Sequence, residues 1–162
     1  MERLFNFAAG PAVLPESVLA HASEHLLSLG GTGIGILEHS HRGDAFGEII
    51  ASAEARIRRL AALPDDVDVL FLQGGASLQF AMVPANLRDD QHIANYINSG
   101  TWSTKAIDAA SATGRVHVAA SSESTGFRHL PEPPVLSEFP AYLHYTSNNT
   151  IAGTQFPNPP TR

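Results

Sequence analysis

The chain is predicted to pass from a strand into a helix within residues 70–80, Leu70-Phe71-Leu72-Gln73-Gly74-Gly75-Ala76-Ser77-Leu78-Gln79-Phe80. Residues 67–72 are short and apolar, as in a buried strand, and the two glycines that follow allow a tight turn. Backbone amides at the start of the next helix would point toward an anion, and Ser77 adds a hydroxyl donor. This pattern is typical of a phosphate site, but it also suits a tight turn without a ligand. It matches neither the Walker pattern nor Gly-x-Gly-x-x-Gly.

The segments around this turn show helical and strand patterns in alternation. A helix is predicted to follow Pro15 and to stop at Gly30, and a second one to run from Asp44, as its N-cap, to Leu63. Pro84 predicts an early end or a kink in the helix that follows the glycine turn. The second helix carries an apolar stripe that is predicted to be buried, formed by Phe46, Ile49, Ile50, Ala53, Ile57 and Leu60. Further elements are expected as strands at 92–97, 116–120 and 141–146 and as a helix at 102–113.

Strands that alternate with helices indicate an α/β fold, a mostly parallel sheet with helices on both faces. Residues 1–15 are expected to form an N-terminal arm, and residues 16–162 a single large domain. That domain is expected to be incomplete, because the chain ends where such a sheet would still need strands.

The composition excludes several classes of protein. The chain has 162 residues, of which 43% are hydrophobic and 16% are charged, and it has no cysteine. Disulfides, thiolate catalysis and cysteine-bound zinc are therefore excluded. No apolar run approaches the roughly 18 residues of a membrane span, and the N-terminus lacks a signal core. The net charge of −6 and the scattered basic residues argue against nucleic acid as a partner. We expect a cytoplasmic protein with neither a membrane nor a nucleic-acid partner.

Three other segments could carry chemistry. Trp102, the only tryptophan, follows a predicted strand, where its indole could stack on an aromatic ligand or belong to the core. His39 and His41 could chelate zinc, but no third ligand is evident, so no metal site is expected. Arg42 suits a carboxylate or a phosphate, and equally an exposed position in solvent. Residues 144–154 form a strand end followed by a run of hydroxyl and amide side chains. These side chains could orient a polar ring substituent or only satisfy a turn.

Five segments together resemble the phosphoserine aminotransferase family, class V enzymes of fold type I that use pyridoxal 5'-phosphate. They are residues 6–15, 38–43, 73–80, 100–103 and 147–154, in the family's order.

The resemblance assigns roles at the matching positions. It implies that Ala76 and Ser77 donate to the cofactor phosphate. It implies that Trp102 stacks on the pyridine ring and that Thr150 hydrogen-bonds near the ring hydroxyl. A substrate carboxylate or phosphate would be held by Arg42 and His41, and the backbone of Ala9 would line the same pocket.

The resemblance also implies a reaction and partners. The reaction is amino transfer between L-glutamate and 3-phosphohydroxypyruvate, which gives O-phospho-L-serine and 2-oxoglutarate in serine and pyridoxine biosynthesis. A homodimer is implied as well. Two alternatives stay open, namely another class V aminotransferase of the alanine–glyoxylate or serine–pyruvate type, and a non-catalytic phosphate-binding or interaction fragment. A nucleotide-binding Rossmann domain is disfavoured, because no acidic residue ends the strand where a ribose would bind.

The chain departs from the family in one chemical respect. Amino transfer on this cofactor needs a lysine that forms a Schiff base, and the only lysine, Lys105, lies inside a predicted helix just after Trp102. The family's lysine and the carboxylate partner of the ring nitrogen match positions beyond residue 162. We therefore expect no catalytic residue in this chain, and no amino transfer by the 162 residues without a complementary C-terminal part.

Overall fold

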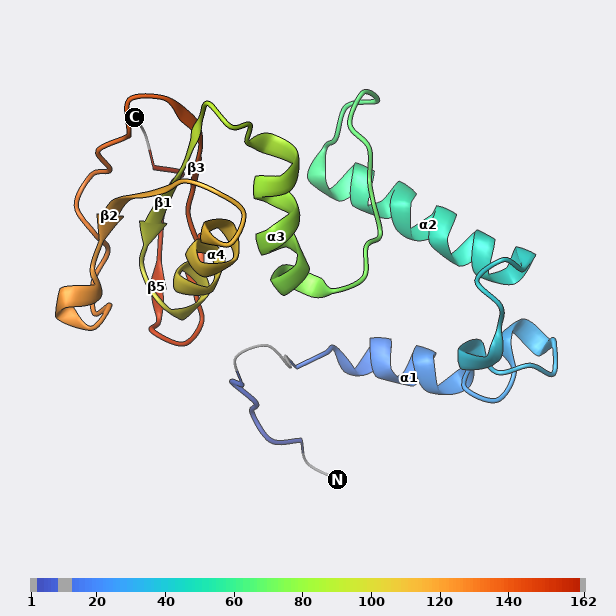
Figure 1. Ribbon diagram of the computed structural model, residues 1–162. Coiled ribbons are helices and arrows are strands. Elements are labelled where there is room, and N and C mark those ends of the chain that lie inside the picture. Colours follow the sequence, from blue (N-terminus) through green and yellow to red (C-terminus); the bar gives the residue numbers. More distant parts are fainter. Residues whose placement is uncertain (1–2, 9–12, 161–162) are drawn as a thin grey trace. The chain divides into compact units, whose positions relative to one another are not determined.

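The computed structural model describes residues 3–8 and 13–160. The chain separates into two compact units, Met1–Phe71 and Leu72–Arg162, and each is described by itself (Figure 1). None of the helices in the described residues combines the length and the apolar character that a membrane crossing requires.

The described residues of the first unit, 3–8 and 13–71, form two α-helices and two short 3-10 turns. Helix α1 spans Glu16–Glu24, the turns η1 and η2 span Leu29–Gly31 and Ile36–Glu38, and helix α2 spans Asp44–Ala61. Both predicted helices are confirmed, but α1 is shorter than expected because a separate 3-10 turn forms at Gly30, where φ is +55°. The N-cap prediction for Asp44 is wrong. Gly43 takes that position, and Asp44 is the first helical residue, where its negative charge suits the helix dipole.

The apolar stripe of α2 is not buried as predicted. No residue of α2 is fully buried, and Leu60 is 81% exposed. The stripe stays accessible because an open groove, rather than a packed partner, faces its Ile49 and Ala53 within this unit.

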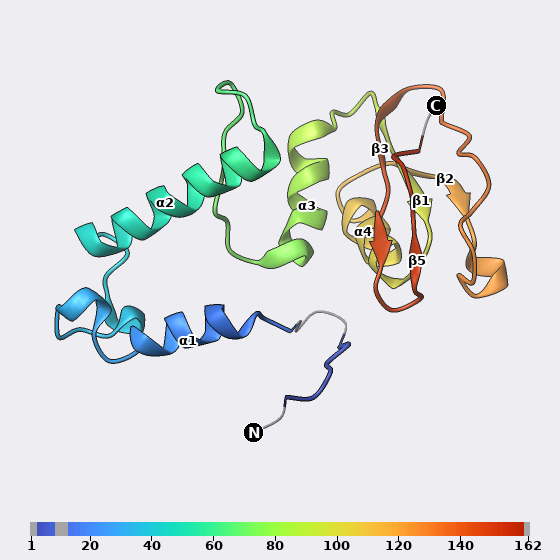
Figure 2. The same ribbon diagram turned by 180° about the vertical axis from the view of Figure 1, so that it is seen from behind.

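The second unit is a parallel sheet with flanking helices (Figure 2). Its elements are α3 (Gly75–Leu87), β1 (Ile93–Asn98), α4 (Thr101–Ser111), β2 (Val116–Ser121), η3 (Glu123–Thr125), β3 (Pro140–His144), β4 (Asn148–Asn149) and β5 (Thr154–Gln155). The strand order is β2-β1-β3, and β1 is parallel to both neighbours, while β4 and β5 form a small antiparallel hairpin. The α/β class is confirmed. The hairpin was not predicted, because two-residue strands leave no periodic signal.

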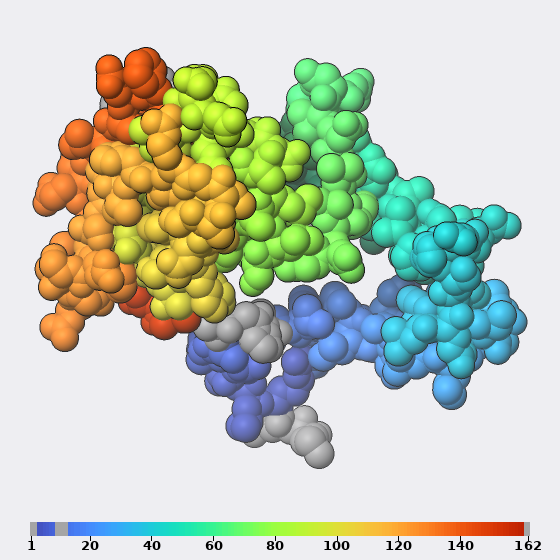
Figure 3. All heavy atoms as spheres, viewed as in Figure 1, coloured from blue at the N-terminus to red at the C-terminus, as the bar shows by residue number. Residues whose placement is uncertain are grey.

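The core of this unit lies between β1 and the helices. Ala94 and Tyr96 of β1 pack against Ala106 and Ala110 of α4, all of them at most 1% exposed. Small residues on α4 let the helix approach the strand closely, and α3 packs against α4 in turn (Figure 3). The central strand β1 is therefore fixed, and its C-terminal end becomes a rigid platform for the residues that follow.

Two predictions around the glycine turn are wrong. Residues 67–72 form no strand, and Leu70 and Phe71 are 72% and 50% exposed. A strand needs a neighbour for its backbone hydrogen bonds, and no described segment pairs with this one. The predicted early end of the helix at Pro84 is also wrong, because α3 continues past this buried residue to Leu87. The alternative, a kink at Pro84, stays a prediction.

Candidate functional site

The second unit contains a cavity of about 380 Å³ where several elements of the sheet end. Its lining comes from three segments far apart in the sequence: Ala76 and Phe80 of α3, Trp102 of α4, and residues 144–148 and 150, which begin at the last residue of β3. Ligand pockets lie typically at the carboxyl ends of parallel strands, and about 300 Å³ is enough for a small ligand. Three of the predicted site residues, Ala76, Trp102 and Thr150, therefore line one cavity.

One wall of this cavity is the N-terminus of α3. Gly74 is the N-cap, in the left-handed conformation at φ 88°, and no side chain caps the helix. A Cβ at Gly74 would lie 2.6 Å from the Cβ of Leu78, so only glycine fits the turn that starts the helix. The first-turn amides consequently keep their hydrogen-bonding capacity for an anion. Ser77 is exposed in this same turn but is not among the residues that line the cavity.

Trp102 and Thr150 meet across the cavity. The indole Nε1–H of Trp102 donates to Thr150 Oγ1 at 3.1 Å, although the two residues are 48 positions apart. Because Thr150 Oγ1 accepts this bond, its own O–H is left to donate to another group. The Nζ of Lys105 lies 4.8 Å from the centroid of the Trp102 ring, a cation–π contact that fixes the indole further.

Aromatic residues that the sequence did not single out also belong to the site. Phe80 and His144 both line the cavity, and His144 packs against Tyr96, with ring centroids 5.0 Å apart. The hydroxyls of Tyr96 and Tyr142 lie 2.7 Å apart, and burial raises the pKa of both. The position of His144 near the end of a predicted strand could have indicated a cavity residue. Phe80, in contrast, has the sequence position of an ordinary helical residue.

The burial of the His144 imidazole predicts that the protein loses stability in acid. Its Nδ1 has no partner among the described residues, and burial lowers the pKa of the imidazole below its usual value. The unfolded chain, with a pKa near 6.5, then binds the proton more readily than the folded protein, so the free energy of unfolding falls as pH drops below about 6.5. One proton contributes at most about 1.4 kcal/mol per pH unit.

We expect His144→Phe to lose less stability between pH 7.5 and pH 5.5 than the unsubstituted protein, as measured by urea unfolding at both values. Phenylalanine keeps the aromatic packing against Tyr96 but takes up no proton. An equal loss of unfolding free energy between the two pH values in both proteins would show that His144 does not cause the sensitivity to acid.

The predicted substrate residues belong to the first unit, whereas the residues that line the cavity belong to the second. His41 and Arg42 are exposed in the turn before α2, where Arg42 N–H donates to Ser40 Oγ at 3.2 Å. Neither side chain has a salt bridge or a side-chain hydrogen bond among the described residues, so both remain available to a ligand. Ala9 lies outside the described residues.

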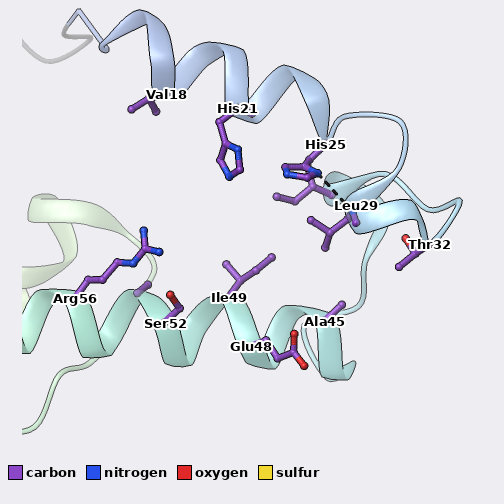
Figure 4. A pocket seen from close by; sticks show the side chains of 14 residues that line it. Val18, His21, His25, Leu29, Thr32, Ala45, Glu48, Ile49, Ser52 and Arg56 are labelled. Atoms are coloured by element: carbon purple, nitrogen blue, oxygen red, sulfur yellow. Dashed lines mark hydrogen bonds between the residues drawn. The ribbon is translucent and has the colours of Figure 1, made fainter.

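The first unit also contains a groove of about 870 Å³ between α1 and α2 (Figure 4). His21 and His25 point into it from α1, and Glu48 and Arg56 come from α2. The ligand atoms of His21, Glu24 and His25 lie within 4.8 Å of one another, whereas no such group includes His39 or His41 among the described residues. His21 and Glu24 are exposed on one turn of one helix, and only His25 is partly buried.

Comparisons with known proteins show the family of the chain. The sequence matches the family model described as Aminotransferase class-V over residues 4–160. Curated phosphoserine aminotransferases of Nitrosomonas europaea and Listeria monocytogenes are each 51% identical to it, over 158 and 156 residues. These alignments cover 96% and 95% of this chain and 43% of each relative. The chain therefore spans less than half the length of the curated relatives that it matches.

Two solved structures share the arrangement of the chain. Phosphoserine aminotransferase from Bacillus circulans subsp. alkalophilus matches with a TM-score of 0.89 and 44% identity, over 98% of this chain and 44% of that one. Phosphoserine aminotransferase from Trichomonas vaginalis with bound pyridoxal phosphate matches with a TM-score of 0.88 and 33% identity, over 99% and 46%. A family model that spans nearly all residues, together with relatives at 51% identity, shows that the chain belongs to the class V aminotransferase family.

Proposed function

We propose that this chain is the cofactor-binding part of a phosphoserine aminotransferase and that its cavity binds pyridoxal 5'-phosphate. One observation carries the proposal: Ala76, Trp102 and Thr150 line a single cavity although they come from three separate segments. The relatives at 51% identity are named phosphoserine aminotransferases, and the Trichomonas vaginalis structure has this cofactor bound.

The residues present fit the two ends of this cofactor. The uncapped N-terminus of α3 offers backbone amides and a favourable dipole for the phosphate, and Ser77 adds a hydroxyl. At the other end Trp102 presents a flat indole for the ring and excludes water from one face. Thr150, held by the Trp102 N–H, keeps its O–H free for the ring hydroxyl.

When bound, pyridoxal phosphate supplies a ring that withdraws electrons from the carbon next to the amino group. This chain's residues bind and orient rather than move protons. We propose that Arg42 holds a substrate carboxylate or phosphate through its planar guanidinium, with His41 and the backbone of Ala9 beside it. The substrates proposed are L-glutamate and 3-phosphohydroxypyruvate, in serine and pyridoxine biosynthesis.

The cellular setting and assembly are proposed on the same basis. We propose a cytoplasmic homodimer, and a division of the chain into an arm, residues 1–15, and a cofactor-binding large domain, residues 16–162. When the chain is combined with a complementary C-terminal part, competition between a keto acid with its phosphate and the same acid without it separates this function from another class V aminotransferase.

A second candidate function is a phosphate-binding module without catalysis. One observation favours it. The only lysine, Lys105, lies on α4, with its Nζ at the Trp102 ring, and it is not among the residues that line the cavity. If the chain acts alone, we expect it to bind the cofactor but not to transfer amino groups.

Binding can be followed through a single fluorophore. Trp102 is the only tryptophan, so quenching of its emission reports directly on this cavity. We expect pyridoxine 5'-phosphate to quench this emission saturably. Pyridoxine without phosphate should reach the same quenching only at a concentration at least about tenfold higher, which corresponds to the loss of one or two charge-assisted hydrogen bonds. The alcohol replaces the aldehyde so that no imine forms with Lys105 or the N-terminus. Inorganic phosphate should compete with the phosphorylated ligand. Equal affinity for the two pyridoxine forms, or no quenching, would refute the proposed site.

A further inference from the structure

Asn149 is a buried amide that joins the two sides of the cavity without lining it. It is 1% exposed, and its Nδ2 donates to the backbone oxygen of Ser99 at 2.6 Å and to Ser99 Oγ at 3.1 Å. Ser99 belongs to the turn between β1 and α4, whereas Asn149 belongs to the β4–β5 hairpin. These bonds therefore tie the hairpin to the turn.

The turn that receives Asn149 is itself rigid. Ser103 Oγ accepts hydrogen bonds from the backbone N–H groups of Ser99 and Gly100, both at 2.9 Å. Gly100 has no Cβ, and a Cβ there would lie 2.4 Å from Asn149 Oδ1. The amide of Asn149 thus lies directly on the backbone of Gly100, two residues before Trp102.

The turn of the β4–β5 hairpin, which carries Thr150, is fixed as well. The N–H of Gly153 donates to the backbone oxygen of Asn149 at 2.7 Å, which closes the turn that presents Thr150. Thr150 follows Asn149 directly. The hydrogen bonds of Asn149 therefore hold together the two short segments that carry Trp102 and Thr150, whose side chains meet at 3.1 Å.

The amide of Asn149 acts in this contact through its N–H donors. Its Nδ2 supplies both bonds to Ser99, whereas its Oδ1 is buried without a hydrogen-bond partner among the described residues. Neither a carboxylate nor an apolar side chain supplies those donors.

We propose that Asn149 is a positioning residue that sets the distance between Trp102 and Thr150, so that the ring-binding half of the cavity is formed before a ligand enters. The inference rests on the proposed function only for the identity of the ligand. Asn149 does not line the cavity, so it would act through Ser99 and Gly100.

The test uses Asn149→Ala and Asn149→Asp, which both remove the N–H donors, while the second keeps the size of the side chain. The matched control is Asn95→Ala, because Asn95 is also fully buried and also bonds a loop, through Nδ2 to Ser137 Oγ at 2.9 Å. Unlike Asn149, it does not join the segments that carry Trp102 and Thr150. Two quantities are measured in the purified protein below its unfolding transition. They are the quenching of Trp102 by acrylamide without ligand and the affinity for pyridoxine 5'-phosphate.

We expect both Asn149 variants to expose Trp102 to acrylamide and to bind the ligand about tenfold more weakly, the effect of one net hydrogen bond. Asn95→Ala should lower the melting temperature but change neither quantity. Unchanged acrylamide quenching in the Asn149 variants, or the same change in Asn95→Ala, would overturn the inference. If the unsubstituted protein fails to bind pyridoxine 5'-phosphate, the proposed function fails, and the acrylamide result still decides the role of Asn149.

Discussion

Ala76→Asp is expected to weaken binding of pyridoxine 5'-phosphate at least 100-fold without lowering the melting temperature. Ala76 is the second residue of α3 and lines the cavity, so a carboxylate there would face the phosphate directly. Two like charges a few ångströms apart repel by several kcal/mol at an effective dielectric constant of about 20. The helix itself tolerates the change, because a negative charge in the first turn interacts favourably with the dipole.

The matched control for this substitution is Ala45→Asp. Ala45 is likewise the second residue of an α-helix, α2, but it belongs to the other unit. It should leave the quenching of Trp102 by pyridoxine 5'-phosphate unchanged. The unphosphorylated pyridoxine should bind Ala76→Asp about as well as the unsubstituted protein, because it carries no phosphate to be repelled. A similar loss for both ligands would show that Asp had damaged the cavity rather than repelled the anion.

Gly100→Ala is expected to lower the free energy of unfolding by about 3 kcal/mol or more. Gly100 has φ 155° and ψ −169°, a conformation that costs a residue with a side chain about 1–3 kcal/mol. The new Cβ would also lie 2.4–2.5 Å from three atoms of the Asn149 side chain. Overpacking of this kind adds about 1–3 kcal/mol, and Asn149 has no free space to withdraw into because it is 1% exposed.

Gly126→Ala separates the two contributions. Gly126 also has a positive φ, +68°, but nothing lies within 4 Å of its Cβ position. The Gly126→Ala variant should therefore lose only about 1 kcal/mol of unfolding free energy, because of backbone strain. Chemical denaturation of both variants gives the comparison, and in an Asn149→Ala background Gly100→Ala should cost measurably less. Equal losses for the two glycines would show that Asn149 does not press on Gly100.

Local signals in the sequence predicted the parts of the candidate site but not the whole. The glycine turn before α3 and the tryptophan after β1 were recognisable because their chemistry is contained in a few consecutive residues. The aromatic residues Phe80 and His144 were not recognised as cavity residues, because a side chain in a periodic element looks the same whether it faces a core or a pocket.

The wrong predictions about the fold have the same origin. Residues 67–72 have the composition of a strand, yet they form none, because a strand depends on a neighbour whose backbone groups can pair with it. The stripe of α2 has helical spacing, yet Leu60 is 81% exposed, because spacing shows which residues share a face but not what covers that face.

The sequence by itself determined the α/β class, the order of the longer elements of the second unit from α3 to β3, and the residue types available for phosphate and ring binding. These properties depend on local backbone preferences and on the alternation of apolar residues, which neighbouring positions encode. Only the tertiary structure decided that Trp102 and Thr150 meet, and that the amide of Asn149 lies on Gly100. Such contacts join residues about 50 positions apart, and their geometry exists only once β1, α4 and the hairpin have packed together.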